Sequence, residues 1–235
     1  QKSRSGGVAR EYPPFRSVSG KNSGPQAGIL TAAFARAGLD VEVDIQPAKS
    51  LVIYALSEEG TPAVMGEKGD FKEVPSEHLV FVPFFVKTAR YYYLAADHQP
   101  IKWNGNLENM RGRVLGLESA PETDAYDKAD IRVVVDNLTD LLQKLLKGEI
   151  DVVGADAERV TWAMNTYFPE NKDALVPMKV PAWQSFSFAV FNTGYKNGQL
   201  LSGRFADALR QMLKDGSYER LLKESGETWV LTPSQ

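Results

Sequence analysis

The hydrophobic and polar positions of this chain alternate between two periods along most of its length. Apolar residues at three- and four-residue spacing predict amphipathic helices, and short apolar or alternating runs predict strands. The predicted helices cover residues 26–37, 49–57, 137–147, 158–168, 204–213 and 218–224. The predicted strands cover residues 8–9, 41–45, 63–65, 81–85, 89–96, 112–117, 131–135, 149–154 and 180–191. Because helices and strands alternate, the pattern predicts an α/β fold with largely parallel sheets.

One pattern occurs twice, in residues 51–67 and again in residues 141–156. Each copy reads as a helix, a glycine, a short apolar strand, a second glycine and a carboxylate. The first copy ends on Glu67 and the second on Asp156. Ligands of open α/β sheets bind beyond the carboxyl ends of the strands. The repeat therefore predicts two α/β lobes that face each other across a cleft, each forming one wall.

Two aromatic, β-prone stretches, near Tyr91 and near Phe186, flank the second copy. We interpret them as two crossings of the chain between the lobes. Lobe 1 is predicted to comprise residues 1–92 plus 187–235, and lobe 2 residues 93–186.

The composition is that of an ordinary globular protein. The 235 residues are 43% hydrophobic and 24% charged, and the net charge is −3 without any block of like charges. This balance does not favour nucleic acid or an anionic membrane surface as a partner. No apolar run approaches the roughly 18 residues that a membrane span requires. Cysteine is absent, which excludes disulfides and thiolate chemistry. The polar start, residues 1–7, leads us to expect a processed chain whose export signal has been removed.

Signatures of catalysis are missing from the sequence. It contains no Gly-x-Ser-x-Gly, His-Glu-x-x-His, phosphate-binding Gly-x-x-x-x-Gly-Lys or dinucleotide-binding Gly-x-Gly-x-x-Gly motif. The two histidines, His78 and His98, have no partners at metal-ligand spacing. We therefore expect a binding protein rather than an enzyme, with no metal and no cofactor.

Several segments together carry a resemblance to a known family. They are Glu11–Phe15 (EYPPF), Phe81–Phe85 (FVPFF), Leu107–Leu117 (LENMRGRVLGL), Leu142–Asp156 and Leu209–Lys223 (LRQMLKDGSYERLLK). In this order they resemble the type 2 periplasmic solute-binding proteins of family 3, which serve polar amino acid uptake. The resemblance implies a two-lobed fold, in which each lobe is a mostly parallel sheet flanked by helices and two crossover strands form the hinge.

The same resemblance implies a function. The expected protein is periplasmic, or extracellular and membrane-tethered, and it captures a small polar ligand, an amino acid or an amine, by closing the cleft. It delivers that ligand to the membrane permease of an ABC transporter. We expect a monomer that binds no nucleic acid.

The resemblance and the strand ends together indicate which residues contact the ligand. Asp156 falls at the family's position for the ligand α-amino group, although an aspartate there is also a preferred helix N-cap. The aromatic corner and Trp183 either stack on the ligand or pack in the protein, and the charged residues are either ligands or solvated. The candidate ligand-binding residues are Tyr12, Phe15, Glu67, Lys68, Lys72, Glu118, Asp156 and Trp183.

This chain departs from the family pattern in one important respect. Family members that bind amino acids carry an arginine seven residues after the glycine that corresponds to Gly66, and this chain has Glu73 there. Lys68 or Lys72 could replace that arginine as a point charge. The carboxylates expected at the cleft, which are Glu67, Glu73, Glu118, Glu122 and Asp156, suggest a cationic or amine-bearing ligand.

Two other functions stay open. The same fold serves as the extracellular sensing domain of membrane-bound histidine kinases and cyclases. Cyclohexadienyl dehydratases also resemble this family, and in such an enzyme Glu118 or Glu122 would act as a general acid.

Overall fold

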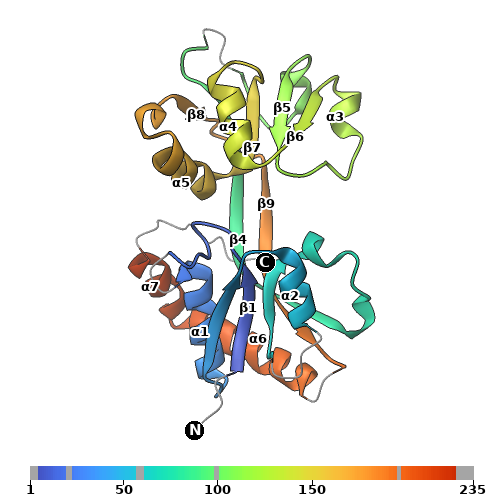
Figure 1. The fold of residues 1–235 in the computed structure, drawn as a ribbon, viewed down its shortest axis with the longest axis vertical. Helices are drawn as coiled ribbons and strands as arrows, with labels where there is room; N and C mark the ends of the chain where they lie inside the picture. The colour runs from blue at the N-terminus through green and yellow to red at the C-terminus, as the bar shows by residue number, and fades with distance from the viewer. Residues whose placement is uncertain (1–4, 20–22, 57–60, 98–100, 195–196, 226–235) are drawn as a thin grey trace. The chain divides into compact units, whose positions relative to one another are not determined.

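The structure is a computed structural model, and it describes residues 5–19, 23–56, 61–97, 101–194 and 197–225. The chain divides into two compact units. Unit 1 comprises Gln1–Val86 and Phe186–Gln235, and unit 2 comprises Lys87–Ser185. Two strands, β4 (Leu79–Leu94) and β9 (Trp183–Asn192), each contribute residues to both units (Figure 1).

Unit 1 is built on parallel strands. β1 (Ser5–Arg10) lies between β2 (Val41–Gln46) and β3 (Val64–Glu67) and runs parallel to both. β3 then pairs with β9 in the antiparallel sense. The helices of this unit are α1 (Pro25–Arg36), α2 (Lys49–Ala55), α6 (Gly198–Lys214) and α7 (Ser217–Glu224).

The core of unit 1 forms because its helices each bury one apolar stripe. Ile29, Leu30, Ala33 and Phe34 lie on the buried face of α1, at the spacing that an amphipathic helix requires. Phe34 packs on Phe205 of α6, with ring centroids 4.9 Å apart. Gly38, at φ +83°, lies just beyond α1 and lets the chain turn towards β2.

Unit 2 repeats the same scheme. β5 (Val114–Leu117) lies between β6 (Arg132–Val135) and β7 (Val152–Asp156), parallel to both. β7 pairs antiparallel with β4, and so does β8 (Leu175–Pro177). The helices of this unit are α3 (Ala125–Lys128), α4 (Leu138–Leu146) and α5 (Ala157–Tyr167).

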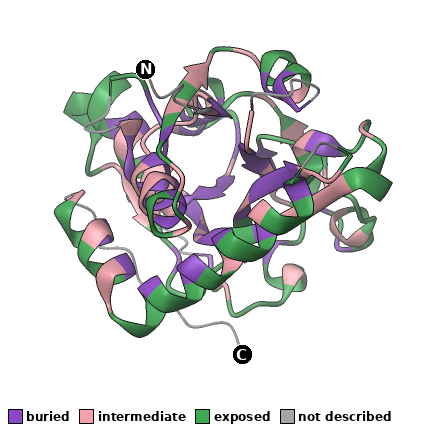
Figure 2. Ribbon diagram, turned by 90° about the horizontal axis from the view of Figure 1, so that it is seen from below, coloured by how far each residue is buried: buried purple, intermediate pink, exposed green. Residues whose placement is uncertain are grey.

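The start of α4 shows how the sequence fixes a helix in unit 2. Asn137 is its N-cap and accepts a hydrogen bond from the backbone N–H of Asp140, at 3.0 Å. Leu138, Leu141 and Leu145 then bury one face of the helix against the sheet. Buried residues concentrate in this way on the strands and on one face of the helices (Figure 2).

The structure confirms most of the predicted elements and corrects the bounds of several. The helix predicted at residues 204–213 begins six residues earlier, since α6 spans Gly198–Lys214. Residues 81–85 and 89–96 belong to one long strand, β4, because the lysine that interrupts the apolar pattern at position 87 is buried and paired. The strand of the second repeat begins at Val152 instead of Glu149 and extends through Asp156. The sequence pattern did not predict β8 or α3. Short 3₁₀ helices lie at Lys68–Phe71 (η2), Ser76–His78 (η3), Leu107–Met110 (η4) and Pro169–Asn171 (η5).

None of the helices in the described part of the chain combines the length and hydropathy of a membrane span.

Candidate functional site

In unit 1, polar residues gather where the parallel strands end. β1 and β3 are parallel, so their carboxyl ends share one edge of the sheet. Tyr12 follows β1 by two residues, and Glu67 is the last residue of β3. Lys68 begins η2 directly after Glu67, and Lys72 follows η2; both lysines are exposed. The structure therefore places these four predicted residues in two segments at one strand-end edge.

A buried arginine that the sequence analysis did not identify organises this edge. Arg16 is fully buried, and its Nη2 lies 3.0 Å from Glu67 Oε2. It also donates to Gln26 Oε1 at 2.7 Å and to the carbonyl oxygen of Arg10 at 2.9 Å. Ser187 links the same groups, because it donates to Glu67 Oε1 at 3.0 Å and accepts from Gln26 Nε2 at 2.9 Å. Glu67 is thus held by a cation and a hydroxyl from its own unit.

The aromatic corner lies against this arginine. The guanidinium carbons of Arg10 and Arg16 lie 5.5 Å and 5.1 Å from the centroid of the Tyr12 ring, within the range of cation–π attraction. Tyr12 is partly buried and stacks on Phe15, with centroids 5.8 Å apart. Phe15 is fully buried and packs edge-on against Phe85. The corner therefore connects the core of unit 1 with the strand-end edge.

A second carboxylate supports the turn after β3. Asp70 accepts a hydrogen bond from the backbone N–H of Glu67 at 3.1 Å and lies 3.9 Å from Arg10. Its pKa is raised above the ordinary value, first by burial and then by the Glu67 carboxylate. Gly66 allows this turn to close, because a Cβ there would lie 2.8 Å from the ring of Phe71.

Unit 2 has a corresponding edge, where the parallel strands β5, β6 and β7 end together. Glu118 follows β5 directly, and Asp156 is the last residue of β7. Glu118 forms an ion pair with Arg159 of α5, with Nη2 and Oε1 2.5 Å apart. The structure thus places both predicted acids of this lobe at one edge and gives Glu118 a cationic neighbour.

Asp156 also has a cationic partner. The Lys87 Nζ lies 3.7 Å from Asp156 Oδ2, and the two side chains are only 1% and 8% exposed. Asp156 occupies the N-cap position of α5, but its side chain makes no capping hydrogen bond. The alternative interpretation of Asp156 as a side-chain helix cap is therefore wrong.

Burial changes the acid–base properties of two neighbours. Burial raises the pKa of Glu158, and the nearby Asp156 carboxylate raises it further. Burial likewise raises the pKa of the Tyr92 hydroxyl, and the nearby Glu158 raises it further. Arg90 lowers both of these pKa values and donates to the carbonyl oxygens of Met178 and Lys179. Charges of both signs therefore surround Asp156.

Trp183 has a packing role in unit 2. Its ring lies edge-on to Tyr91, with centroids 5.8 Å apart. A Cβ at Gly154 would lie 2.9 Å from Trp183 and equally close to Tyr91. The second glycine of this repeat is therefore required by the two aromatic rings, as Gly66 is required by Phe71 in the first.

The distribution of charge differs from what the sequence suggested. Of the five carboxylates from which a cationic ligand was inferred, Glu67, Glu118 and Asp156 form ion pairs within their own units. The fold brings a cation to each of these three acids, and the number of acids in the sequence does not show this. The sequence contains one indication that Lys87 is paired, because it is a charged residue inside an apolar, aromatic strand. Arg16 and Arg159 had no comparable signal, since their partners are distant in sequence.

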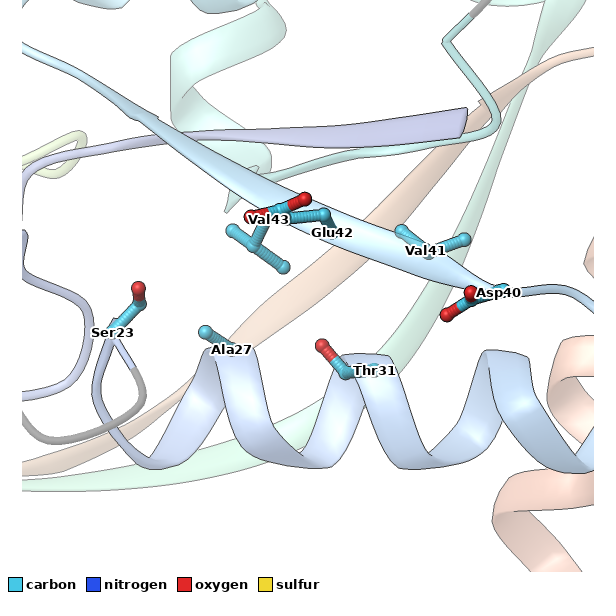
Figure 3. Close-up of a pocket in the computed structure, with 7 residues that line it drawn as sticks. All are labelled: Ser23, Ala27, Thr31, Asp40, Val41, Glu42 and Val43. Carbon is cyan, nitrogen blue, oxygen red and sulfur yellow. The ribbon is translucent and has the colours of Figure 1, made fainter. Parts of the chain in front are cut away.

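A pocket of about 300 Å³ lies elsewhere in unit 1, between α1 and β2 (Figure 3). Its lining residues are Ser23, Ala27, Thr31, Asp40, Val41, Glu42 and Val43. None of the predicted ligand-binding residues lines it. It borders the first half of β2, whereas the strand-end edge lies beyond the carboxyl ends of the neighbouring parallel strands.

Comparison with solved structures identifies the fold. A histidine kinase sensor domain with similarity to periplasmic binding proteins matches with a TM-score of 0.67 and 19% identity, covering 98% of each chain. An ancestral arginine-binding protein bound to arginine matches with a TM-score of 0.64 and 20% identity, covering 95% of this chain and 99% of that one. The GluR0 ligand-binding core from Nostoc punctiforme, in complex with L-glutamate, matches with a TM-score of 0.61 and 14% identity. This match covers 93% of this chain and 97% of that one.

No protein-family model and no curated protein sequence matches this chain. The structural matches nevertheless extend over nearly the whole chain, and they confirm the predicted α/β fold, which is like that of periplasmic binding proteins.

Proposed function

We propose that this protein is an extracytoplasmic solute-binding protein for a small polar molecule. The ligand is bound at the strand-end edges, through Tyr12 and Glu67 of unit 1 and Glu118 and Asp156 of unit 2. One observation supports this proposal most strongly: in both units, charged residues cluster at the carboxyl ends of parallel strands, where ligands of open α/β sheets bind.

The proposed mechanism is a shift between an open and a closed form. A ligand favours closure only by the difference in its contacts with the two forms. Contacts supplied by both units are made together only when the protein is closed, so binding shifts the population towards that form. The closed, loaded form is then recognised by the membrane permease of an ABC transporter.

The comparisons support a ligand of amino acid size. Among the matching structures, an ancestral arginine-binding protein holds arginine or glutamine, and the GluR0 ligand-binding core holds L-glutamate. Because Glu67, Glu118 and Asp156 are ion-paired, we extend the proposal from amino acids and amines to other small polar acids.

A thermal-shift screen tests this function. The panel comprises amino acids, amines, dicarboxylates and 2-oxo acids, and a ligand at 100 times its Kd stabilises the protein by about 2.7 kcal/mol. Tyr12→Ala should weaken the response to any hit, whereas Tyr54→Ala, at an exposed position of α2, should leave it unchanged. A panel without any stabilising compound, or a hit that responds equally to both substitutions, contradicts the proposal.

The second candidate function is sensing. It is favoured by the match to a histidine kinase sensor domain over 98% of both chains. The complete reading frame distinguishes the two roles, because a membrane span followed by a kinase or cyclase domain marks a sensor. A dehydratase-like activity is the third possibility, and it is tested by turnover of prephenate or arogenate.

A further inference from the structure

We propose that Lys87 determines which ligand group the strand-end edge of unit 2 accepts. Its ammonium acts as a built-in counter-ion of Asp156, so that this edge selects an oxygen acceptor, such as a carboxylate or carbonyl group, in place of a ligand ammonium. This inference rests on the proposed function and defines the substrate class of the same site.

The pairing of β4 with β7 brings the two residues together. Ala89 of β4 lies opposite Asp156 in the antiparallel ladder. Lys87 is two residues before Ala89, so it lies on the same face of β4 and diagonally across from the end of β7. β7 ends at Asp156, and a lysine side chain is long enough to reach that carboxylate. The distance of 3.7 Å is that of an ion pair rather than a hydrogen bond.

The burial of Lys87 shows that the pair belongs to the architecture of the edge. Lys87, Ala89 and Tyr91 alternate along one buried face of β4, where an ammonium without a counter-ion would be costly. Asp156 is 7% exposed and makes no capping hydrogen bond. The charged groups nearby are Glu158, whose pKa responds to both Asp156 and Lys87, and Arg90. The four side chains are two carboxyl groups and two cationic groups.

This arrangement disfavours a ligand ammonium for a simple reason. A second cation beside Asp156 would have to share the carboxylate with Lys87 and would be repelled by it at short range. Displacing Lys87 would leave a buried ammonium without its counter-ion, which is strongly unfavourable. A ligand oxygen meets the opposite situation, because the Lys87 ammonium attracts it. The edge should therefore prefer the member of a ligand pair that has an oxygen where the other has an ammonium.

Matched pairs of small molecules test this selectivity. The pairs are L-glutamate with 2-oxoglutarate, L-alanine with pyruvate, and L-phenylalanine with phenylpyruvate; within each pair a carbonyl oxygen replaces the ammonium. Isothermal titration of the full chain should show tighter binding of the 2-oxo acid in every pair that binds. Lys87→Met should reduce this preference at least tenfold or reverse it.

Two control variants isolate the effect of Lys87. Lys87→Arg keeps the positive charge and should keep the sign of the preference. Lys128→Met removes the lysine of an exposed pair with Asp124 in the same unit, and it should change nothing. The inference is overturned if the wild-type protein binds the amino acid at least as tightly as its 2-oxo partner, or if Lys87→Met leaves the ratio unchanged.

Asp156→Asn provides the answer if Lys87→Met does not fold. If Asp156 bound a ligand ammonium, this substitution would abolish binding of the amino acids. If Lys87 selects oxygen acceptors, the Asp156→Asn variant should still bind the 2-oxo acids more tightly than the matched amino acids, because the positive charge is then less compensated. Failure of the proposed function has a different signature, which is that no compound of any class binds to the wild-type protein or to any variant.

Discussion

The Arg16 guanidinium lies 3.0 Å from the Glu67 carboxylate, and this ion pair joins residues that are 51 positions apart. It connects the loop after β1 with the end of β3. Gln26 and Ser187 hydrogen-bond to the pair from α1 and β9. Four separate segments of unit 1 are therefore fixed at one point beside Tyr12, so breaking this network should lower the free energy of unfolding.

Replacing Arg16 by methionine should destabilise the protein strongly. The substitution removes a fully buried cation and leaves Glu67, whose side chain is 22% exposed, without it. Breaking a buried pair by removing one partner costs about 3–5 kcal/mol, and the partial exposure of Glu67 places this case near the lower limit. Urea unfolding measures the change in free energy.

The control for Arg16 is Arg111→Met. Arg111 forms a comparable pair with Glu108, but both side chains are about half exposed, so solvent screens the pair and the loss of stability should be much smaller than for Arg16→Met. If the free energy of unfolding falls no more in the Arg16 variant than in the Arg111 variant, the structural role of the buried pair is contradicted.

Gly154 and Gly28 should respond to alanine in opposite directions. A Cβ at Gly154 would lie 2.9 Å from Trp183 and Tyr91, so Gly154→Ala should cost about 1–3 kcal/mol through overpacking. A Cβ at Gly28 in α1 meets nothing within 4 Å, so Gly28→Ala should stabilise the helix by about 0.5–1 kcal/mol. Thermal unfolding of the two variants checks the signs, and equal shifts would show that the packing around Gly154 is misplaced.

Glu158 should make the protein less stable as the pH rises. Its folded-state pKa is raised above the ordinary value of 4.5 by burial and by Asp156. Between the unfolded and folded pKa values the folded state binds more protons, so the free energy of unfolding falls as the pH rises through that window. Glu158→Gln removes this decrease.

The measurement is a series of urea unfolding curves from about pH 4.5 to about pH 7, which spans the window above the ordinary glutamate pKa. The difference in stability between Glu158→Gln and the wild-type protein should grow in favour of the variant across this range. Glu170→Gln changes an exposed glutamate of the same unit and serves as the control. A constant difference over the whole range would show that the Glu158 carboxyl is not perturbed.

The sequence predicted the elements better than it predicted the site, and the reason is physical. Periodicity is local, so α1, α4 and β5 were predicted to within a few residues. Glu67 and Asp156 were found at strand ends because a glycine and a carboxylate close each copy of the repeat. The fold class also followed from the order of segments, and the structural comparisons confirm it.

The electrostatics of the site were not predictable in the same way. Whether the Asp156 carboxylate is available to a ligand depends on Lys87. The two residues meet only through the register of β4 on β7. Glu118 meets Arg159 only because α5, which carries Arg159, begins directly after β7 at the edge where β5 also ends. A count of acids in the sequence therefore overstated the negative charge, since each pairing is a tertiary contact.

Unit 2 should fold without the rest of the chain. Its two hydrophobic clusters consist entirely of residues between 91 and 183, and the clusters of unit 1 contain none of these residues. Its strands pair with one another through β4, β7, β5 and β6. A fragment of residues 87–185, which is continuous in sequence, keeps all of these interactions. We expect it to show helical circular dichroism and one cooperative urea transition, with a smaller m-value than the full chain because less surface is exposed on unfolding.

Two substitutions make the test of this fragment specific. Leu141→Ala removes a fully buried side chain of unit 2, so it should destabilise both the fragment and the matching transition of the full chain by about 2–5 kcal/mol. Leu213→Ser changes an exposed position in unit 1 and should leave that transition unchanged. If the fragment unfolds without cooperativity, unit 2 depends on unit 1 for its core, because the clusters that it contains are then too small to offset the conformational entropy of the chain.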